Sequence, residues 1–444
     1  MGYARLGAVS QKTLWITAGI LVLSAGFAYY AWSHPMDLRV YHYGARGVFE
    51  GTRPVYGPGS GLGWPMHYRY PPLFLLLFAP LAMLPLGWAA AIWVVGKVAV
   101  LVVLLRALER RLKPATTFGS QNGHQNGPRG PQNGPPKPQN GDQNVVAGFS
   151  RRYAVIISFL LITPYLVEEF RYGNAQFFVV ALTAASLLLV REKPVLSAAS
   201  LALGISIKVW PLFFVPYLAA RRDWKVAGYT LGFVVLLAIL PSLYFGFFGN
   251  VDLLGQWFSQ ESQTQLGNSE IWFPNQSLRG LLTRYLTVVD YSQVPDSNYP
   301  QVHIAALDPG LVRWIWLIVA AAAYAAFLVA ACRRRNTNGW LDHGLAFCLL
   351  PLLQPFTQKY ALAVLLWPAL IAGFLIAKPG LRIFIYLSIV LALVQPLAPG
   401  SATQRLLQVL GLDFAVTLFL AAAIAYAGHE FAEDSFRSHK TEKT

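Results

Sequence analysis

The sequence predicts an all-α polytopic membrane protein, a bundle of about 12 transmembrane helices joined by loops that carry short helices. Charged residues make up 12% of the 444 residues and hydrophobic residues 55%, with a mean hydropathy of +0.45. A soluble domain carries about 25% charged residues. Apolar runs of about 18–25 residues recur along the whole chain, and in lipid such runs form helices because every backbone polar group must be satisfied internally.

The net charge of +15 comes from basic residues that gather at the ends of the apolar runs. This distribution is the positive-inside signal of a multispanning protein. A nucleic-acid partner is not expected, because no long stretch combines basic and aromatic residues. The two cysteines, Cys332 and Cys348, lie in apolar runs and indicate packing rather than a disulfide or metal framework. The first apolar run lacks a small-residue cleavage site, which favours a retained span over a signal peptide.

We expect spans at residues 14–32, 88–107, 152–167, 175–191, 195–207, 209–220, 226–245, 311–332, 342–355, 359–377, 381–397 and 410–428. This even number places both termini on the cytoplasmic side of a plasma (inner) membrane, together with the basic clusters. Residues 71–86 are apolar but contain four prolines. They are expected to form a re-entrant or interface-lying helix that does not cross the membrane, because a crossing would move the basic linker 106–152 outside.

Three segments stand out within a single integral membrane domain that covers residues 1–444. Residues 33–70 form the outer loop in which we expect the chemistry, and residues 246–310 form a second, acidic outer loop. Residues 114–150 contain a Gln-Asn-Gly-Pro repeat that cannot bury apolar surface, so they predict a disordered cytoplasmic insert. No segment suits a nucleotide-sugar-binding domain, and Gly-rich phosphate-binding motifs are absent.

The outer loop 33–70 carries Asp37 and four arginines, against the positive-inside trend. Guanidinium groups match phosphate geometry, which favours an anionic ligand, although interfacial anchoring is the alternative. A carboxylate such as Asp37 at the mouth of a membrane cavity can act as a general base, although helix capping or a salt bridge would also explain it. The loop lacks a paired acidic motif, so no metal ion or other cofactor is implied.

Lys208 lies between two short apolar segments, in the sequence GISIKVWPLFFVPY. An ionisable residue at that depth is costly and commonly faces a functional cavity, although a lysine can also extend to the interface. Pro211 predicts a broken helix with half-helix ends near Lys208. The topology places further polar residues on the same outer face, each of which could be an ordinary turn residue: Glu168, Glu169, Arg171, Asn174, Gln176, Asn275, Gln276, Gln354, Gln358 and Lys359.

Four segments in order resemble glycosyltransferase family 87, within the membrane-embedded C-type superfamily, which includes polyprenyl-phosphate-mannose-dependent α-mannosyltransferases. They are Asp37 with LRVY, PVY and YRYPPLF, then GNAQFFVVAL at 173–182, LALGISIKVWPLFFVPYLAARRDWK at 201–225, and PNQSLRGLLTR at 274–284. Two segments depart from the family pattern. PFTQKYAL replaces a turn of Trp-Asp-His-His type, and Gly173-Asn174-Ala175-Gln176 replaces the Gly-Gln pair.

The resemblance implies a membrane glycosyltransferase that moves a hexose, with mannose favoured, from a polyprenyl-phosphate donor to a lipid or glycan acceptor at the outer face. It implies inversion, with Asp37 as the base and charge stabilisation of the leaving phosphate by Lys208 and by Arg39 or Arg69. The residues expected to bind the substrates are His42, Tyr68, Tyr70, Asn174, Gln176, Asn275, Gln276, Gln358 and Lys359.

A transporter or flippase of a lipid-linked or anionic substrate is the alternative. Such proteins also contain broken helices and buried charges, but commonly show internal repeats, which this sequence lacks. An oligosaccharide ligase would also use a lipid-linked donor, and would transfer a preassembled glycan instead of one hexose. Consumption of the lipid-linked sugar separates both enzymes from a transporter.

Overall fold

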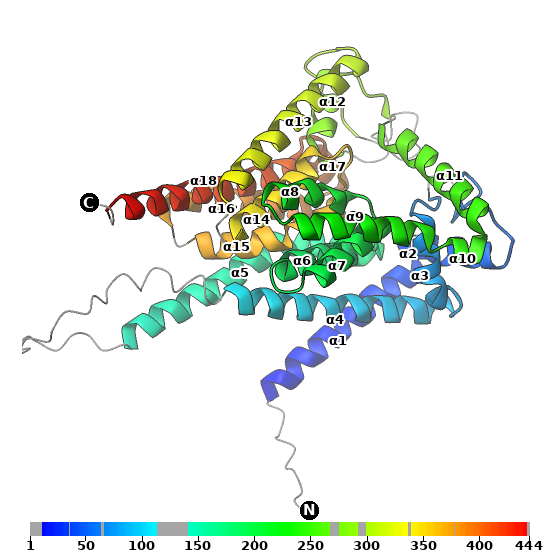
Figure 1. The fold of residues 1–444 in the computed structure, drawn as a ribbon, viewed down its shortest axis with the longest axis horizontal. Coiled ribbons are helices and arrows are strands. Elements are labelled where there is room, and N and C mark those ends of the chain that lie inside the picture. The colour runs from blue at the N-terminus through cyan, green and yellow to red at the C-terminus, as the bar shows by residue number, and fades with distance from the viewer. Residues whose placement is uncertain are drawn as a thin grey trace, which may run out of the picture.

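The computed structural model describes residues 11–34, 36–63, 66–112, 141–266, 275–291, 299–335, 339–376 and 378–441, in which the regular structure is entirely helical (Figure 1). The first half contains α1 (Gln11–Ser33), α2 (Asp37–Phe49), α3 (Pro72–Ala82), α4 (Leu86–Leu112), α5 (Gly141–Tyr172), α6 (Gln176–Leu189), α7 (Pro194–Ile207), the 3-10 helix η2 (Trp210–Phe213) and α8 (Phe214–Ala220). The second half contains α9 (Trp224–Ile239), α10 (Ser242–Phe245), α11 (Phe247–Leu266), α12 (Leu278–Leu286), α13 (Pro309–Arg333), α14 (Trp340–Leu353), η5 (Lys359–Leu365), α15 (Leu366–Leu375), η6 (Pro379–Leu381), α16 (Arg382–Leu397), α17 (Ser401–Val409) and α18 (Leu412–Thr441).

Each expected span coincides with an apolar helix or a pair of consecutive helices, but fewer than 12 are long enough to cross a membrane. In the described part of the chain, five helical segments meet that length and hydropathy: 86–108, 224–245, 309–333, 379–397 and 412–430. Others are shorter: α7 has 14 residues, about 21 Å, against about 30 Å of hydrocarbon. The all-helical class is therefore confirmed, whereas the number of crossings stays a prediction.

The structure agrees with the expectation for residues 71–86 but differs in part from that for residues 114–150. α3 has 11 residues, or about 16 Å, which is too short for a crossing and suits the expectation for residues 71–86. The structure places residues 141–150 of the expected disordered insert in α5, whereas residues 114–140 lie outside the described ranges. Extension of an established helix adds one hydrogen bond per residue and needs no new nucleus, so α5 can continue beyond its apolar part.

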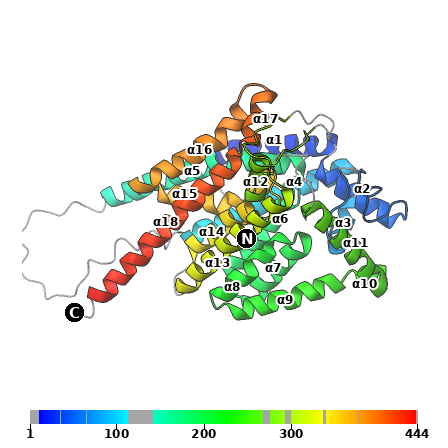
Figure 2. The same cartoon turned by 90° about the horizontal axis from the view of Figure 1, so that it is seen from above.

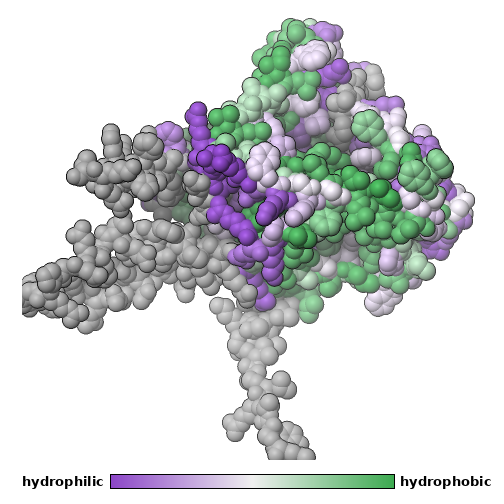
Figure 3. All heavy atoms as spheres, in the orientation of Figure 1, coloured by the Kyte–Doolittle hydropathy of each residue, from purple (hydrophilic) through white to green (hydrophobic). Residues whose placement is uncertain are grey.

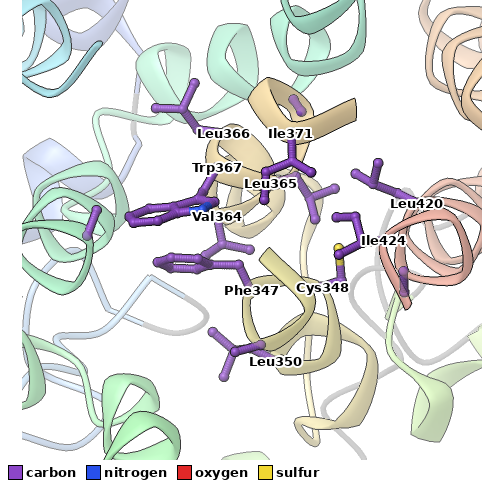
Figure 4. Close-up of a cluster of buried hydrophobic side chains, with 14 of the residues drawn as sticks. Phe347, Cys348, Leu350, Val364, Leu365, Leu366, Trp367, Ile371, Leu420 and Ile424 are labelled. Carbon is purple, nitrogen blue, oxygen red and sulfur yellow. The ribbon is translucent and has the colours of Figure 1, made fainter. Parts of the chain in front are cut away.

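The main core lies where α5, α6, α7, α14, α15 and α18 meet. Figure 4 shows its centre, where Phe347 and Cys348 of α14 pack among Val364, Trp367 and Ile424. Cys348 is completely buried and both cysteines are free, as expected for packing residues. The surface in Figure 3 has a broad hydrophobic area between hydrophilic residues at its two sides, as a lipid-facing belt requires.

A second, aromatic core lies at the end of the bundle formed by α2, α3, α10 and α11, which stay together in both views (Figure 1 and Figure 2). The ring of Tyr41 on α2 meets Tyr70, Phe74 and Trp93 edge-on, with centroids 4.8, 5.1 and 6.1 Å away. Such edge-to-face pairs add about 0.5–1.5 kcal/mol each beyond the burial of their area. This core fixes α2 and the segment 66–70 against the turn between α5 and α6.

Gly173 in that turn allows the close approach of α2. Its φ is +64°, and a Cβ at this position would lie 2.8 Å from the Cβ of Leu38. A side chain therefore meets both a backbone penalty and a steric clash, and the turn cannot relax without moving Asn174.

We expect Gly173→Ala to destabilise the protein by more than about 1–2 kcal/mol, the usual cost of a left-handed conformation for an L-residue. Thermal unfolding of the detergent-purified protein measures it. Gly228→Ala is the matched control, because Gly228 lies in α9 with nothing within 4 Å of a Cβ. It should be neutral or stabilising by about 0.5–1 kcal/mol. Equal unfolding temperatures for the two variants would contradict the role given to Gly173.

Candidate functional site

Asp37 is the first residue of α2, where a negative charge interacts favourably with the helix dipole. Its side chain is partly buried, and its Oδ2 accepts a hydrogen bond of 2.7 Å from Nδ2 of Asn174. Within the described ranges, Oδ1 accepts no hydrogen bond. One carboxylate oxygen is therefore held in place, and the other can accept a proton or a hydrogen bond from a ligand.

Asn174 connects the groups of this site. Its Oδ1 accepts from Nζ of Lys208 at 2.8 Å, from the hydroxyl of Tyr70 at 3.3 Å and from the backbone amide of Gln176 at 2.8 Å. The orientation of the amide follows from its partners, since Oδ1 faces three donors and Nδ2 faces the carboxylate of Asp37. Asn174 is buried, and these partners satisfy the hydrogen-bonding capacity of both its Oδ1 and its Nδ2.

Lys208 lies in an extended conformation between α7 and η2, with φ −140° and ψ 131°. The expected break in the helix is therefore present, and it directs this side chain toward Asn174. Nζ also donates to Oε1 of Gln176 at 3.2 Å and lies 5.3 Å from the ring centres of both Tyr70 and Tyr360. The carboxylate of Asp37 and the amine of Lys208 are thus bridged by Asn174 and form no direct ion pair in the part of the chain that the structure describes.

The electrostatic balance around Asp37 favours a proton acceptor. Burial raises the pKa of Asp37 above its ordinary value, while the hydrogen bond from Asn174 and the charges of Lys208, Lys97 and Arg69 lower it by smaller amounts. Burial also raises the pKa values of Tyr41 and Tyr70, so both remain phenols at neutral pH. Their hydroxyls lie 2.5 Å apart, and that of Tyr41 accepts from the amide of Ala175 at 3.2 Å.

The structure brings five of the expected site residues together: Asp37, Tyr70, Asn174, Gln176 and Lys208. We call them the Asn174 cluster.

Arg69 lies beside the cluster, but its guanidinium makes a two-pronged pair with Glu261 of α11 at 2.9 and 3.1 Å. The side chain of Tyr68 packs behind Tyr70, with ring centres 6.0 Å apart. Arg69 and Tyr68 therefore pack around the cluster, and neither is hydrogen-bonded to Asp37 in the part of the chain that the structure describes.

The structure does not bring Arg39 or His42 to the cluster. Arg39 donates to the carbonyl of Trp32 at 3.0 and 2.7 Å, and His42 contacts the carbonyl of Leu84 at 2.8 Å. A residue two positions after Asp37 lies about 200° further around a helix, and one five positions after lies about 140° around, so neither can share its face. The substrate roles expected for them stay predictions.

The remaining expected residues, Asn275, Gln276, Gln358 and Lys359, lie outside the Asn174 cluster, and the hydrogen bonds of three of them connect other segments of the chain. Asn275 donates to the carbonyl of Pro355 at 2.7 Å and accepts from the amides of Ser277 and Thr357, while Gln276 donates to the carbonyl of Gln408. They join the start of α12 to the turn before η5. Gln358 precedes η5, and Lys359 donates to Gln395 of α16 at 3.1 Å.

Sequence reasoning missed Tyr41, Tyr360 and Lys97. Tyr41 and Tyr360 carry no local signal, since aromatic residues are frequent in every apolar segment of this chain. Lys97 carried one, because a lysine within the apolar run GWAAAIWVVGKVAVLVVLL is costly in a membrane helix. In the described residues, no group of three or more His, Cys, Asp or Glu side chains is placed to hold a metal ion.

An apolar groove of about 550 Å³ runs between α3, α4 and α6 and begins next to the Asn174 cluster. Ala175 and Ile207 line one part of it, and each is the sequence neighbour of a cluster residue. From there it continues along α6 as far as Leu188 and along α4 as far as Ala107. A polar site and an apolar groove are therefore adjacent.

The family model of glycosyltransferase family 87 matches residues 68–355. The chain belongs to glycosyltransferase family 87. The family membership and the apolar helices of the chain together indicate a multi-pass membrane protein. The matched region contains Asn174, Lys208 and Asn275, whereas Asp37 and Lys359 lie outside it.

The chain is also similar to a polyprenol-phosphate-mannose-dependent alpha-(1-2)-phosphatidylinositol mannoside mannosyltransferase from Mycobacterium tuberculosis. The two are 25% identical over 243 residues, which are 51% of this family-87 chain and 49% of that relative. The chain thus matches about half the length of the curated relative.

Proposed function

We propose that this family-87 protein transfers a hexose, mannose in our proposal, from a polyprenyl-phosphate donor to a lipid or glycan acceptor at the outer membrane face. The observation that carries the proposal is the bridge through Asn174, which holds the Asp37 carboxylate and the Lys208 amine at the head of an apolar groove. Family membership and the donor named for the mycobacterial relative support the donor class.

In this mechanism Asp37 is the base and the anomeric carbon is inverted. An acceptor hydroxyl attacks that carbon as Oδ1 of Asp37 takes its proton, and the bond from the carbon to the phosphate oxygen breaks. The phosphate leaves with the electron pair as polyprenyl phosphate, and the positive charge of Lys208 stabilises it. The protonated amine of Lys208 has three donors, of which Asn174 and Gln176 use two, so the third can reach a phosphate oxygen.

The groove supports a lipid-linked donor rather than a soluble one. All its lining residues are apolar, and burial of a methylene group contributes about 0.8 kcal/mol. A polyprenyl chain along α6 would place its phosphate next to Lys208, since Ile207 and Ala175 lie where the groove meets the cluster. A flippase would use the same two features, and covalent consumption of the donor distinguishes it from a transferase.

A matched pair of variants separates the two proposed roles. Asp37→Asn keeps the size of the side chain but cannot accept the proton, so we expect kcat to fall by about 100-fold or more with little change in donor binding. Lys208→Met should lower kcat and also raise the KM for the donor, because the lysine binds the donor phosphate and stabilises the charge that develops on it. Transfer of radiolabelled sugar from a polyprenyl-phosphate donor in detergent measures both. Turnover near that of the wild type for Asp37→Asn would remove Asp37 as the base.

The pH dependence of kcat provides a second test of the base. Asp37 works only when ionised, and burial raises its pKa above the ordinary value of 3.8. We therefore expect kcat to decrease as the pH falls through a value above that of an exposed Asp, about 3.9. The residual rate of Asp37→Asn should lack this acidic limb. A wild-type profile that stays flat down to about pH 4 would contradict the assignment.

A larger side chain in the groove should raise the KM for long-chain donors and leave the KM for short-chain donors unchanged. Ala185→Phe narrows the groove, and displacing about two methylene groups, at about 0.8 kcal/mol each, raises the KM for a long polyprenyl donor about tenfold. A donor with a short prenyl chain should be unaffected. Ala326→Phe is the matched control, because Ala326 is an exposed alanine on α13 outside the groove. An unchanged KM for the long donor in Ala185→Phe would place the lipid elsewhere.

A further inference from the structure

Lys97 of α4 and Glu169 of α5 form an ion pair inside the bundle. Nζ lies 2.8 Å from Oε2, and both side chains are 0% exposed. Removing two charges from water costs several kcal/mol each, and well-packed apolar residues in their place are often as stable or more so. The stability of the fold alone therefore does not explain why this pair is present.

The pair joins the end of α5 to the beginning of α6. Nζ of Lys97 also donates to the carbonyl of Glu169 at 3.2 Å, and Oε1 of Glu169 accepts from the amide of Phe177 at 2.9 Å. That carbonyl is in the last turn of α5 and that amide in the first turn of α6, where backbone groups lack partners within their own helices. The signs of the two charges also match the dipoles of the two helix ends.

A second residue of α4 holds the same turn. The indole Nε1 of Trp93 donates to the carbonyl of Gly173 at 2.8 Å. Trp93 and Lys97 are four residues apart, so they lie on one face of α4. This face thus contacts Glu169 before the turn 173–175, Gly173 within it and Phe178 after it. The central residue of the turn is Asn174.

We propose that Lys97 and Glu169 are positioning residues, which hold the amide of Asn174 between Asp37 and Lys208. The inference rests on the proposed function, because it explains how the bridge of that site is kept in place. Asn174 must meet partners on two other elements at 2.7 and 2.8 Å. A displacement of about 1 Å would break one of these hydrogen bonds, and such misplacements cost about 100-fold in rate.

Two double variants remove both charges and differ only in the acceptor for the Phe177 amide. Lys97→Met with Glu169→Gln retains an acceptor oxygen, whereas Lys97→Met with Glu169→Leu has none. We expect the Gln variant to lose about threefold in kcat, because Lys97 no longer holds the carbonyl of Glu169, and the Leu variant to lose about 10- to 100-fold. The KM for the donor should change less than kcat, since Lys208 also contacts Gln176 and two tyrosine rings. Equal kcat values for the two double variants would overturn the proposal.

A control and a further variant exclude a general loss of stability. Asp342→Asn weakens another buried ion pair, with Arg221 at 2.8 Å, which is unconnected to the turn. It should lower the unfolding temperature but leave kcat per folded molecule unchanged. If the Leu variant does not fold, Trp93→Phe removes a single hydrogen bond to the same turn and no charge. It should also lower kcat, measured with a short-chain donor because Trp93 lines the groove, and an unchanged kcat for it would contradict the proposal.

Hydrogen–deuterium exchange tests the turn without any substrate. Peptides that cover residues 170–178 should exchange faster in the Leu double variant than in the Gln double variant, because the Phe177 amide loses its acceptor. Equal exchange in the two would overturn the inference. Failure of the wild type to transfer sugar would overturn the proposed function alone, since the exchange comparison does not depend on catalysis.

Discussion

The amide of Asn174 is the contact on which the rest of the site depends. It donates to Asp37 at 2.7 Å and accepts from Lys208 at 2.8 Å, and so holds a carboxylate and an amine close together without a direct ion pair. A direct pair would lower the pKa of the Asp37 carboxyl further, because an opposite charge in contact favours the ionised form. The bridge leaves Oδ1 of Asp37 without a hydrogen bond from the described residues, next to an amine that has a donor to spare.

Several ion pairs lie in parts of the molecule that are otherwise apolar. Near Asn174, Lys97 pairs with Glu169, and Arg69 pairs with Glu261 and so joins the segment before α3 to α11. At the ends of α8 and α13, Asp342 joins Arg221 and Arg334. These charges are paired within the protein, as burial demands, and each pair connects the end of one helix to another element. The polar interior is therefore organised around helix ends, where unpaired backbone groups already need partners.

Much of the Asn174 cluster could be predicted because its members carry local signals. Lys208 stands beside a proline within an apolar run, Asn174 and Gln176 lie in a glycine turn, and Asp37 follows the first span. Tyr41 and Tyr360 could not be found in this way, since nothing in their sequence surroundings differs from other aromatic positions. Arg39 and His42 were expected near the substrates because they share a segment with Asp37, but the phase of α2 directs them to the ends of other helices.

The sequence by itself determined that this chain is a helical membrane protein and where a helix breaks beside Lys208. These properties depend on hydropathy and on proline, glycine and charge over short distances, where the cost of unsatisfied backbone in lipid leaves few alternatives. Only the tertiary structure decided which polar residues meet. Asp37, Asn174 and Lys208 come from three elements separated by 137 and 34 positions. Their contact depends on how helices rotate and pack, a long-range property that no local pattern encodes.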